Sequence, residues 1–247
     1  MPHQRTPKVF PDPDALSAGA ARRFVELAAA SIAARGRFAV ALSGGSTPKR
    51  LYQLLASPSF IDQIDWPNID FFFGDERCVA LDHPDSNFRM AQEALFSTGS
   101  ARTAHVFPVP ADCAPEEAAA KYAEQIEQTV PFKNGLPKFD LILLGVGPDG
   151  HTASLFPDTP ALDVIDRIAV AVYAQAKGNW RVTLTFPTLN NAAHTVVLLE
   201  GAPKAVIVAR LCSNAPPAGW PIERIIPRDE VQWYMDEAAA SQIQGRY

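Results

Sequence analysis

The chain has 247 residues, of which 47% are apolar and 20% charged, and this length allows one large α/β domain or two small ones. No apolar run is as long as a membrane span, and the N-terminus has no apolar signal core, so we expect a cytoplasmic protein that binds no membrane. The net charge of −5 gives no general attraction for nucleic acid. The 3 cysteines are widely spaced, which predicts neither a metal site nor a disulfide framework. An anionic substrate must then be bound by a local group of Arg, Lys and backbone N–H groups.

Short β-rich runs alternate with helix-like stretches along the chain. The candidate strands are 38–42, 69–73, 139–144, 168–172, 181–186 and 195–199. The candidate helices are 14–34, 48–56, 86–96, 115–129 and 203–212. Strands that are apolar almost throughout are typical of burial on both faces, so the pattern predicts a mostly parallel sheet with helices on both sides.

The chain contains no long linker, repeat or low-complexity segment. We therefore predict a single domain over residues 1–247, with residues 1–10 as a tail. In such sheets ligands bind beyond the carboxyl ends of the strands. This rule directs attention to the loops after strands 38–42, 69–73 and 139–144.

The third of these loops, GVGPDG, resembles a dinucleotide-binding fingerprint. That fingerprint also needs a sustained helix and a second strand ending in an acidic residue, and here Pro157 and Pro160 cut the helix short. The loop ALSGGSTPKRLY resembles a nucleoside triphosphate-binding loop but lacks its Gly-Lys-Ser/Thr ending. Both nucleotide interpretations are therefore disfavoured.

The SGGSTP turn has the ingredients of a site for a single phosphate. It combines backbone N–H groups, hydroxyls and a helix N-terminus, and its candidate residues are Gly44, Gly45, Ser46 and Thr47. The alternative is simple capping of the following helix by Ser46 or Thr47. Two consecutive glycines exceed what a cap needs, which favours phosphate binding.

His151 follows the glycine turn at the end of strand 139–144. A neutral imidazole there can take a proton from water, and Asp149 can orient the ring or favour its protonated form. The alternative is a turn in which Asp149 hydrogen-bonds its own backbone and His151 has no chemical role. The spacing by itself leaves both open.

Charged residues also gather after strand 69–73 and near the C-terminal elements. The loop GDERCVALDHPDSNFRM carries Asp75, Glu76, Arg77, His83 and Arg89, and could equally be a salt-bridged surface loop. Arg181 opens a strand. Lys204 lies in the first turn of a helix, where the helix dipole disfavours a cation unless an anion is nearby.

Together, ALSGGSTPKRLY, GDERCVALDHPDSNFRMA and LLGVGPDGHTASLFP resemble the signatures of the 6-phosphogluconolactonase family, and WRVTLTFPTLNNA and GAPKA match as well. The resemblance covers about residues 17–239. It implies hydrolysis of 6-phosphogluconolactone to 6-phosphogluconate without a metal or organic cofactor. It also implies a Rossmann-like three-layer α/β/α fold, which the family shares with glucosamine-6-phosphate deaminases, and a monomer.

The resemblance assigns roles residue by residue. His151 would be the general base, assisted by Asp149, and Arg77 would lie near the lactone. The 6-phosphate would be bound by Gly44, Gly45, Ser46 and Thr47 with Arg181 and Lys204, while Asp75, His83 and Arg89 remain possible contacts.

Two rival functions deserve a test. The related deaminases have a glutamate before the final proline of the GxDGH loop, and Phe156 occupies that place here. A sugar-phosphate sensor that has lost catalysis is the second rival, because a fold does not determine a function. Retention of His151, Asp149 and Arg77 argues against it.

Overall fold

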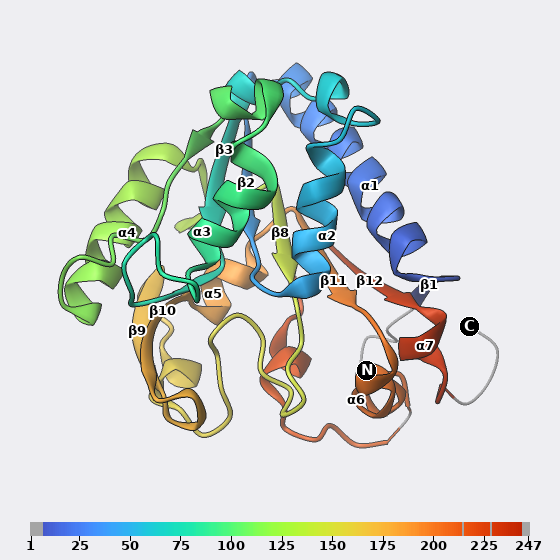
Figure 1. Cartoon of the computed structure of the whole chain (residues 1–247). Coiled ribbons are helices and arrows are strands. Elements are labelled where there is room, and N and C mark those ends of the chain that lie inside the picture. Colours follow the sequence, from blue (N-terminus) through green and yellow to red (C-terminus); the bar gives the residue numbers. More distant parts are fainter. Residues whose placement is uncertain (1–6, 214, 228, 244–247) are drawn as a thin grey trace.

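The computed structural model describes residues 7–213, 215–227 and 229–243. Its central sheet has 7 strands in the order β1-β12-β11-β8-β2-β3-β5, and every pairing within it is parallel. Figure 1 shows helices on both sides of this sheet. The predicted three-layer α/β/α sandwich with a parallel central sheet is confirmed.

The strands of the central sheet are β1 (Pro7–Phe10), β2 (Phe38–Leu42), β3 (Ile69–Phe73), β5 (His105–Val106), β8 (Leu141–Leu144), β11 (His194–Leu199) and β12 (Glu230–Asp236). A second sheet contains β4 (Asp75–Arg77), β9 (Ala169–Ala174) and β10 (Asn179–Leu184), and a short hairpin contains β6 (Phe132–Lys133) and β7 (Leu136–Pro137). The helices are α1 (Pro13–Arg35), α2 (Ser46–Leu55), α3 (Asn87–Ala91), α4 (Pro115–Thr129), α5 (Phe186–Asn190), α6 (Ala205–Leu211) and α7 (Glu237–Ala240).

The period of two in a strand divides the apolar residues between two cores. In β2, Phe38, Val40 and Leu42 pack with α1 and α2, whereas Ala39 and Ala41 face the core that contains α4, α5 and α6. All five of these side chains are buried. Burial on both faces explains why the strand is apolar throughout.

Local signals define where the long first helix begins and ends. The Asp12 side chain accepts a hydrogen bond from Ala15 N at 2.7 Å, and Pro13 occupies the first helical position. Gly36 ends α1 with φ of 79°, a left-handed conformation that glycine adopts without a steric penalty.

The chain changes direction across the sheet between β2 and β8. From β2 it proceeds outward through β3 and β5, and from β8 it proceeds the other way through β11 and β12. The crevice at the carboxyl ends of β2 and β8 is therefore the topological switch point, where parallel α/β sheets bind ligands.

Residues 168–172 and 181–186 are strands, but they do not join the parallel sheet. They fall largely within β9 and β10, which pair antiparallel with each other, and β10 also pairs antiparallel with β4. The near-continuous apolar pattern arises because β9 packs against α4 and both strands contribute to the same core. Apolarity alone does not distinguish a central parallel strand from a strand of a covering layer.

The prediction of a tail over residues 1–10 is wrong for residues 7–10, because these form β1 and pair with Trp233 to Asp236 of β12. Residues 1–6 lie outside the described residues. Phe10 anchors β1: its ring is 9% exposed and lies 5.2 Å from the ring of Tyr234. Gly19 of α1 leaves the space for it, since a Cβ there would lie 2.4 Å from the Phe10 ring.

Two predicted helices have irregular geometry. Residues 86–96 divide into α3 and a π-helical turn over Gln92–Phe96. Residues 203–212 begin with a 3-10 turn, Ala202–Lys204, before α6. None of the helices in the described part of the chain is long and apolar enough to cross a membrane.

Phe10→Ala should lower the free energy of unfolding by about 3 kcal/mol, because it empties a core position between β12 and α1. Lys8→Ala is the matched control, since Lys8 is an exposed neighbour in the same strand, and should cost less than ~1 kcal/mol. Urea unfolding followed by circular dichroism measures both values. Equal losses would show that β1 contributes nothing through Phe10.

Candidate active site

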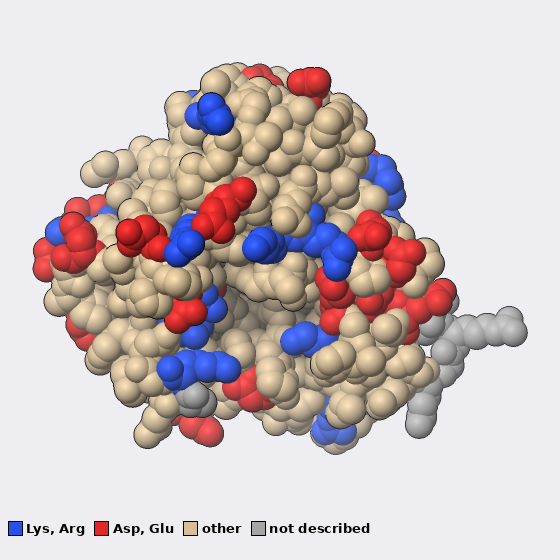
Figure 2. All heavy atoms as spheres, viewed as in Figure 1, with Lys and Arg blue, Asp and Glu red and all other residues tan. Residues whose placement is uncertain are grey.

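A cleft of about 360 Å³ lies at the carboxyl ends of the central strands. Figure 2 shows the hollow with Lys and Arg side chains around it. Among its lining residues are nine of the candidates from the sequence: Gly44, Gly45, Ser46, Thr47, Asp75, Arg77, His151, Arg181 and Lys204. Segments far apart in the sequence therefore contribute to one site.

The SGGST turn connects β2 to α2 along one side of the cleft. Helix α2 begins at Ser46, its N-cap is Gly45 with φ of 107°, and no side chain caps it. The alternative of simple capping by Ser46 or Thr47 is therefore not what the structure has. The first N–H groups of α2 and two hydroxyls remain at the edge of the cleft, as an anion site requires.

Lys204 reaches the cleft from the loop after β11. Its Nζ donates a hydrogen bond to the carbonyl of Val146 at 2.6 Å. Burial lowers the pKa of Lys204, while the negative charge of Asp149 acts in the opposite direction. A half-buried ammonium held this way by a neutral carbonyl lacks a full counter-charge, and a bound anion would supply one.

His151 and Asp149 interact directly. The Asp149 carboxylate lies 2.5 Å from Nδ1 of His151 and also accepts the backbone N–H of His151 at 3.3 Å. Partial burial would raise the pKa of Asp149, but the hydrogen bond and charge of His151 outweigh it and lower that pKa. The two interpretations of Asp149 are thus compatible, because one carboxylate both closes the turn and orients the ring.

Gly147 allows this ring position. A Cβ at Gly147 would lie 2.1 Å from atoms of the His151 imidazole, so any larger residue would displace the ring. Gly147 N also donates to the carbonyl of His151 at 2.8 Å. Two glycines of the pattern that resembled a nucleotide fingerprint thus have packing reasons, Gly147 against His151 and Gly150, with φ of 78°, against Trp220.

Two arginines lie directly opposite each other on adjacent antiparallel strands. Arg77 of β4 is the register partner of Arg181 of β10, and like charges in such a pair repel. Arg181 is 7% exposed, and its guanidinium lies 3.8 Å from the carboxylate of Asp75. Burial lowers the pKa of Arg181, and the charge of Asp75 raises it while that of Arg77 lowers it further. Asp75 is the carboxylate at ion-pair distance from Arg181, and the charges of Glu76 and Asp85 also raise the pKa of Arg181. Two cations side by side at the cleft make this wall suited to a further anion or a developing negative charge.

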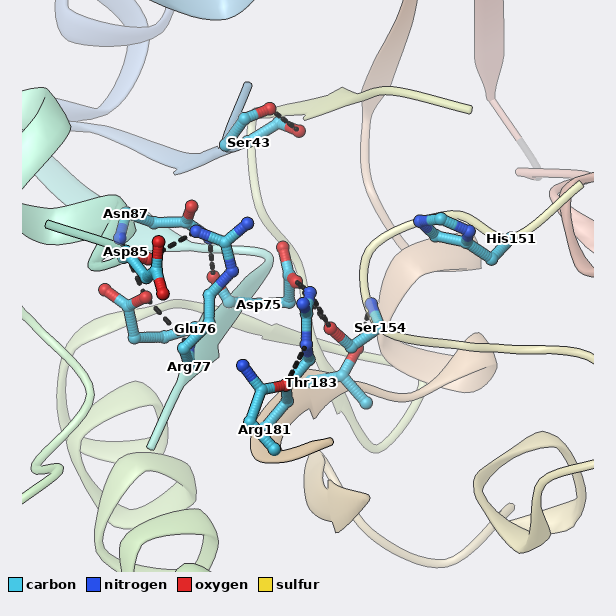
Figure 3. Close-up of polar contacts among 12 residues, drawn as sticks. Ser43, Asp75, Glu76, Arg77, Asp85, Asn87, His151, Ser154, Arg181 and Thr183 are labelled. Atoms are coloured by element: carbon cyan, nitrogen blue, oxygen red, sulfur yellow. Dashed lines mark hydrogen bonds and ion pairs between the residues drawn. The ribbon is translucent and has the colours of Figure 1, made fainter. Parts of the chain in front are cut away.

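Figure 3 shows how the carboxylate of Asp75 is held. It accepts a hydrogen bond from the Ser154 hydroxyl at 2.5 Å, and the Arg181 guanidinium donates to the same hydroxyl at 3.4 Å. The Arg77 guanidinium donates to the carbonyl of Asp85, and its Nε has no partner among the described residues. Arg77 therefore retains donor capacity for a ligand.

Phe156 fills the space beside the histidine. Its ring centroid is 4.4 Å from that of His151, and the Arg181 guanidinium lies 5.5 Å from the same ring. Phe156 is 7% exposed. An apolar ring, rather than a second acid, thus separates the imidazole from the arginine.

Glu76 does not line the cleft, and its carboxylate joins β4 to the start of α3. It is 1% exposed, and its carboxylate accepts backbone N–H groups of Arg77, Asn87 and Phe88 and the hydroxyl of Ser86. Burial raises the pKa of Glu76, although these backbone donors oppose the rise. Its role is structural.

His83 and Arg89 do not line the cleft. His83 Nδ1 accepts the backbone N–H of Asp85 at 3.1 Å, while Arg89 bonds to Glu93 and to the carbonyl of Asp82. The alternative of a hydrogen-bonded surface loop describes these two residues, whereas Asp75 and Arg77 belong to the cleft.

Sequence reasoning missed several lining residues, among them Asn87, Lys177 and Glu200. Asn87 packs directly against Gly44 of the SGGST turn, because its amide oxygen would lie 2.0 Å from a Cβ at that position. Its Nδ2 donates to the carbonyl of Asp75 at 2.8 Å. The only signal for Asn87 was its place after Ser86, which caps α3.

A comparison with known families matches residues 11–233 to the family described as glucosamine-6-phosphate isomerases/6-phosphogluconolactonase. The chain belongs to this family. A 6-phosphogluconolactonase of Synechocystis sp. is 41% identical over 216 residues, covering 86% of this chain and 88% of the relative. One of Nostoc sp. is 37% identical over 243 residues, covering 97% and 99%. The structure of 6-phosphogluconolactonase from Trypanosoma brucei has a TM-score of 0.85 at 30% identity, covering 97% of this chain and 99% of that one.

These findings confirm the resemblance read from the motifs. The family model describes both isomerases and lactonases, so membership does not by itself select the reaction. Among the described residues, no group of three or more His, Cys, Asp or Glu is arranged to hold a metal ion. The predicted lack of a cofactor stays a prediction.

Glu76→Ala should lower the free energy of unfolding by about 3 kcal/mol, because it leaves three backbone N–H groups and a hydroxyl without their acceptor. Glu93→Ala is the control, because it removes an exposed carboxylate from the π-helical turn after α3, and it should cost less than ~0.5 kcal/mol. Urea denaturation of both variants measures the difference. A small loss for Glu76→Ala would mean that water replaces the carboxylate.

Proposed function

We propose that this protein hydrolyses 6-phosphogluconolactone to 6-phosphogluconate. One observation carries the proposal: a histidine oriented by a carboxylate shares a cleft with a helix N-terminus and an incompletely paired lysine. The first group suits proton transfer from water, and the second suits a phosphate. The relatives named 6-phosphogluconolactonase support the same reaction.

The phosphate is assigned to the turn formed by Gly44, Gly45, Ser46 and Thr47, together with Lys204. The backbone N–H groups and hydroxyls of the turn donate hydrogen bonds, and Lys204 adds a positive charge. The prediction that Arg181 joins this site stays a prediction. Its neighbours Asp75 and Arg77 favour instead a position near the lactone, because they lie beyond β3 whereas Lys204 follows β11.

His151 is assigned as the general base. Donation of Nδ1–H to Asp149 leaves Nε2 as the acceptor, and Nε2 takes a proton from water as the water oxygen bonds to the lactone carbonyl carbon. Arg77, with Arg181 beside it, stabilises the negative charge on the carbonyl oxygen. The bond from that carbon to the ring oxygen then breaks, and His151 returns its proton to the ring oxygen. The product carboxylic acid ionises and releases one proton to solvent.

The environment of His151 argues against the deaminase. Phe156 packs on the imidazole where the deaminases have a glutamate, so the acid of the deaminases is replaced at this position by an apolar ring. Asp75 is engaged by Ser154 and Arg181. A non-catalytic sensor is the remaining alternative, and the oriented His151 is what distinguishes the proposed enzyme from it.

The partners and location follow from the proposed activity. We expect a monomer in the cytoplasm whose partner is a sugar-phosphate lactone, with no nucleic acid involved. The net charge of −5 is consistent with this, because only the cleft needs to attract an anion.

His151→Ala should reduce lactone hydrolysis by roughly 10²- to 10⁴-fold, because it removes the group that moves the proton. Binding of 6-phosphogluconate should change by less than about threefold, since the phosphate contacts remain. Proton release from freshly prepared lactone, corrected for spontaneous hydrolysis, measures the rate. His83→Ala is the control, because His83 lies outside the cleft.

Wild-type activity in His151→Ala would remove the histidine from the mechanism. A parallel assay follows ammonia release from glucosamine 6-phosphate. Ammonia without lactone hydrolysis would establish the deaminase, and binding without either reaction would establish the sensor.

Lys204→Met should weaken 6-phosphogluconate binding by about 10- to 100-fold and raise KM similarly, because it removes the charge assigned to the phosphate. Lys49→Met is the control, since Lys49 is an exposed lysine near the start of α2 that does not line the cleft. Titration calorimetry measures both. An unchanged affinity in Lys204→Met would place the phosphate elsewhere.

The pH dependence of binding tests the same lysine. The pKa of Lys204 is lowered, so the free protein loses this charge at a lower pH than it would with an ordinary lysine. Wild-type affinity should therefore fall towards alkaline pH, and this fall should be absent in Lys204→Met.

A further inference from the structure

At the carboxyl end of each of two central strands, a buried tyrosine hydroxyl hydrogen-bonds to both the backbone N–H and the backbone C=O of one residue. The Tyr52 hydroxyl accepts a hydrogen bond from Ser43 N at 3.0 Å and donates one to Ser43 O at 2.8 Å. The Tyr122 hydroxyl forms the same pair of hydrogen bonds with Phe73, accepting one from N at 2.6 Å and donating one to O at 2.8 Å. Both tyrosines are almost completely buried, and burial raises the pKa of each, so the hydroxyls stay protonated and can donate.

These backbone groups need partners that the sheet does not supply. Ser43 lies one residue beyond β2, and the registers of β2 with β3 and β8 end at Leu42 and Ala41. Likewise, the register of β3 with β5 ends at Phe71, two residues before Phe73. A buried backbone N–H and C=O without partners would each cost free energy, and one tyrosine hydroxyl satisfies both.

The hydrogen bonds of Tyr52 and those of Tyr122 join different segments of the chain. Tyr52 belongs to α2, the helix that follows the SGGST turn, so its bonds to Ser43 join the first residue of the turn to that helix. Gly44 and Gly45 lie inside the closed loop. Glycine has the largest backbone freedom to lose, so this segment gains most from fixed ends. Tyr122 comes from α4 and closes no loop that contains the turn.

We propose that Tyr52 is a positioning residue for the phosphate, which its hydroxyl never touches. The hydrogen bonds between Tyr52 and Ser43 hold the N–H groups and hydroxyls of the turn in their binding geometry before substrate arrives. The turn therefore loses less conformational entropy on binding. This inference rests on the proposed function, because it assumes that the turn binds the phosphate.

Tyr52→Phe and Tyr122→Phe provide a matched test, because each removes one buried hydroxyl that holds two backbone groups. Both should lower Tm by roughly 2–6 °C. Tyr52→Phe should raise KM for 6-phosphogluconolactone and the inhibition constant of 6-phosphogluconate by about 5- to 30-fold, with kcat within about twofold. Tyr122→Phe should leave the inhibition constant within about twofold of wild type. Measurements at 10 °C keep both variants folded.

Glucono-1,5-lactone, which lacks the phosphate, provides the second readout. Its kcat/KM should be the same in Tyr52→Phe and wild type, because the turn has no phosphate to bind. An unchanged inhibition constant in Tyr52→Phe, or an equal rise in Tyr122→Phe, would overturn the proposal and make both hydroxyls purely structural.

Lys204→Met distinguishes a failure of this proposal from a failure of the proposed function on which it rests. If Lys204→Met weakens inhibition by 6-phosphogluconate and Tyr52→Phe does not, only the positioning role is wrong. If Lys204→Met also leaves inhibition unchanged, the assigned phosphate site is wrong.

Discussion

The parallel pairing of β2 with β8 is the constraint on which the site depends. This pairing brings the end of β2, which leads into the SGGST turn, next to the end of β8, which leads into the loop with His151. The chain leaves this point in opposite directions, so no connection covers the crevice between the two strand ends. The groups assigned to phosphate binding and to proton transfer are thus held by adjacent strands of one rigid sheet.

The cleft gathers positively charged side chains, although the chain as a whole is negatively charged. The chain carries a net charge of −5, yet Arg77, Arg181 and Lys204 meet in one cleft. Burial lowers the pKa of Lys204 and of Arg181, and Arg77 and Arg181 repel each other across a strand pair. An anionic substrate relieves these costs, so the unfavourable terms of the free protein become a source of binding free energy.

Buried polar groups hold the loops that carry this chemistry. Glu76 accepts the first backbone N–H groups of α3, and Tyr52 and Tyr122 satisfy the backbone beyond the ends of the sheet register. Each supplies a hydrogen bond that regular secondary structure cannot provide, at a helix N-terminus for Glu76 and at a strand end for the tyrosines. The loops that line the cleft are therefore tied to the core by buried hydrogen bonds.

Local sequence patterns were enough to predict the parallel sheet, the three loops at its carboxyl edge and the pairing of His151 with Asp149, because apolar strands, glycine turns and capping residues act over short distances along the chain. Features that depend on distant partners became visible only in the folded chain. The three-residue β4 is too short for a periodic signal, so its pairing with β10, which sets Arg77 against Arg181, was not predictable. For the same reason the edge strand β1, the lining residues Asn87 and Lys177, and the exclusion of His83 and Arg89 required the folded chain. Local pattern specifies which elements form, and only the packing between them specifies which side chains meet.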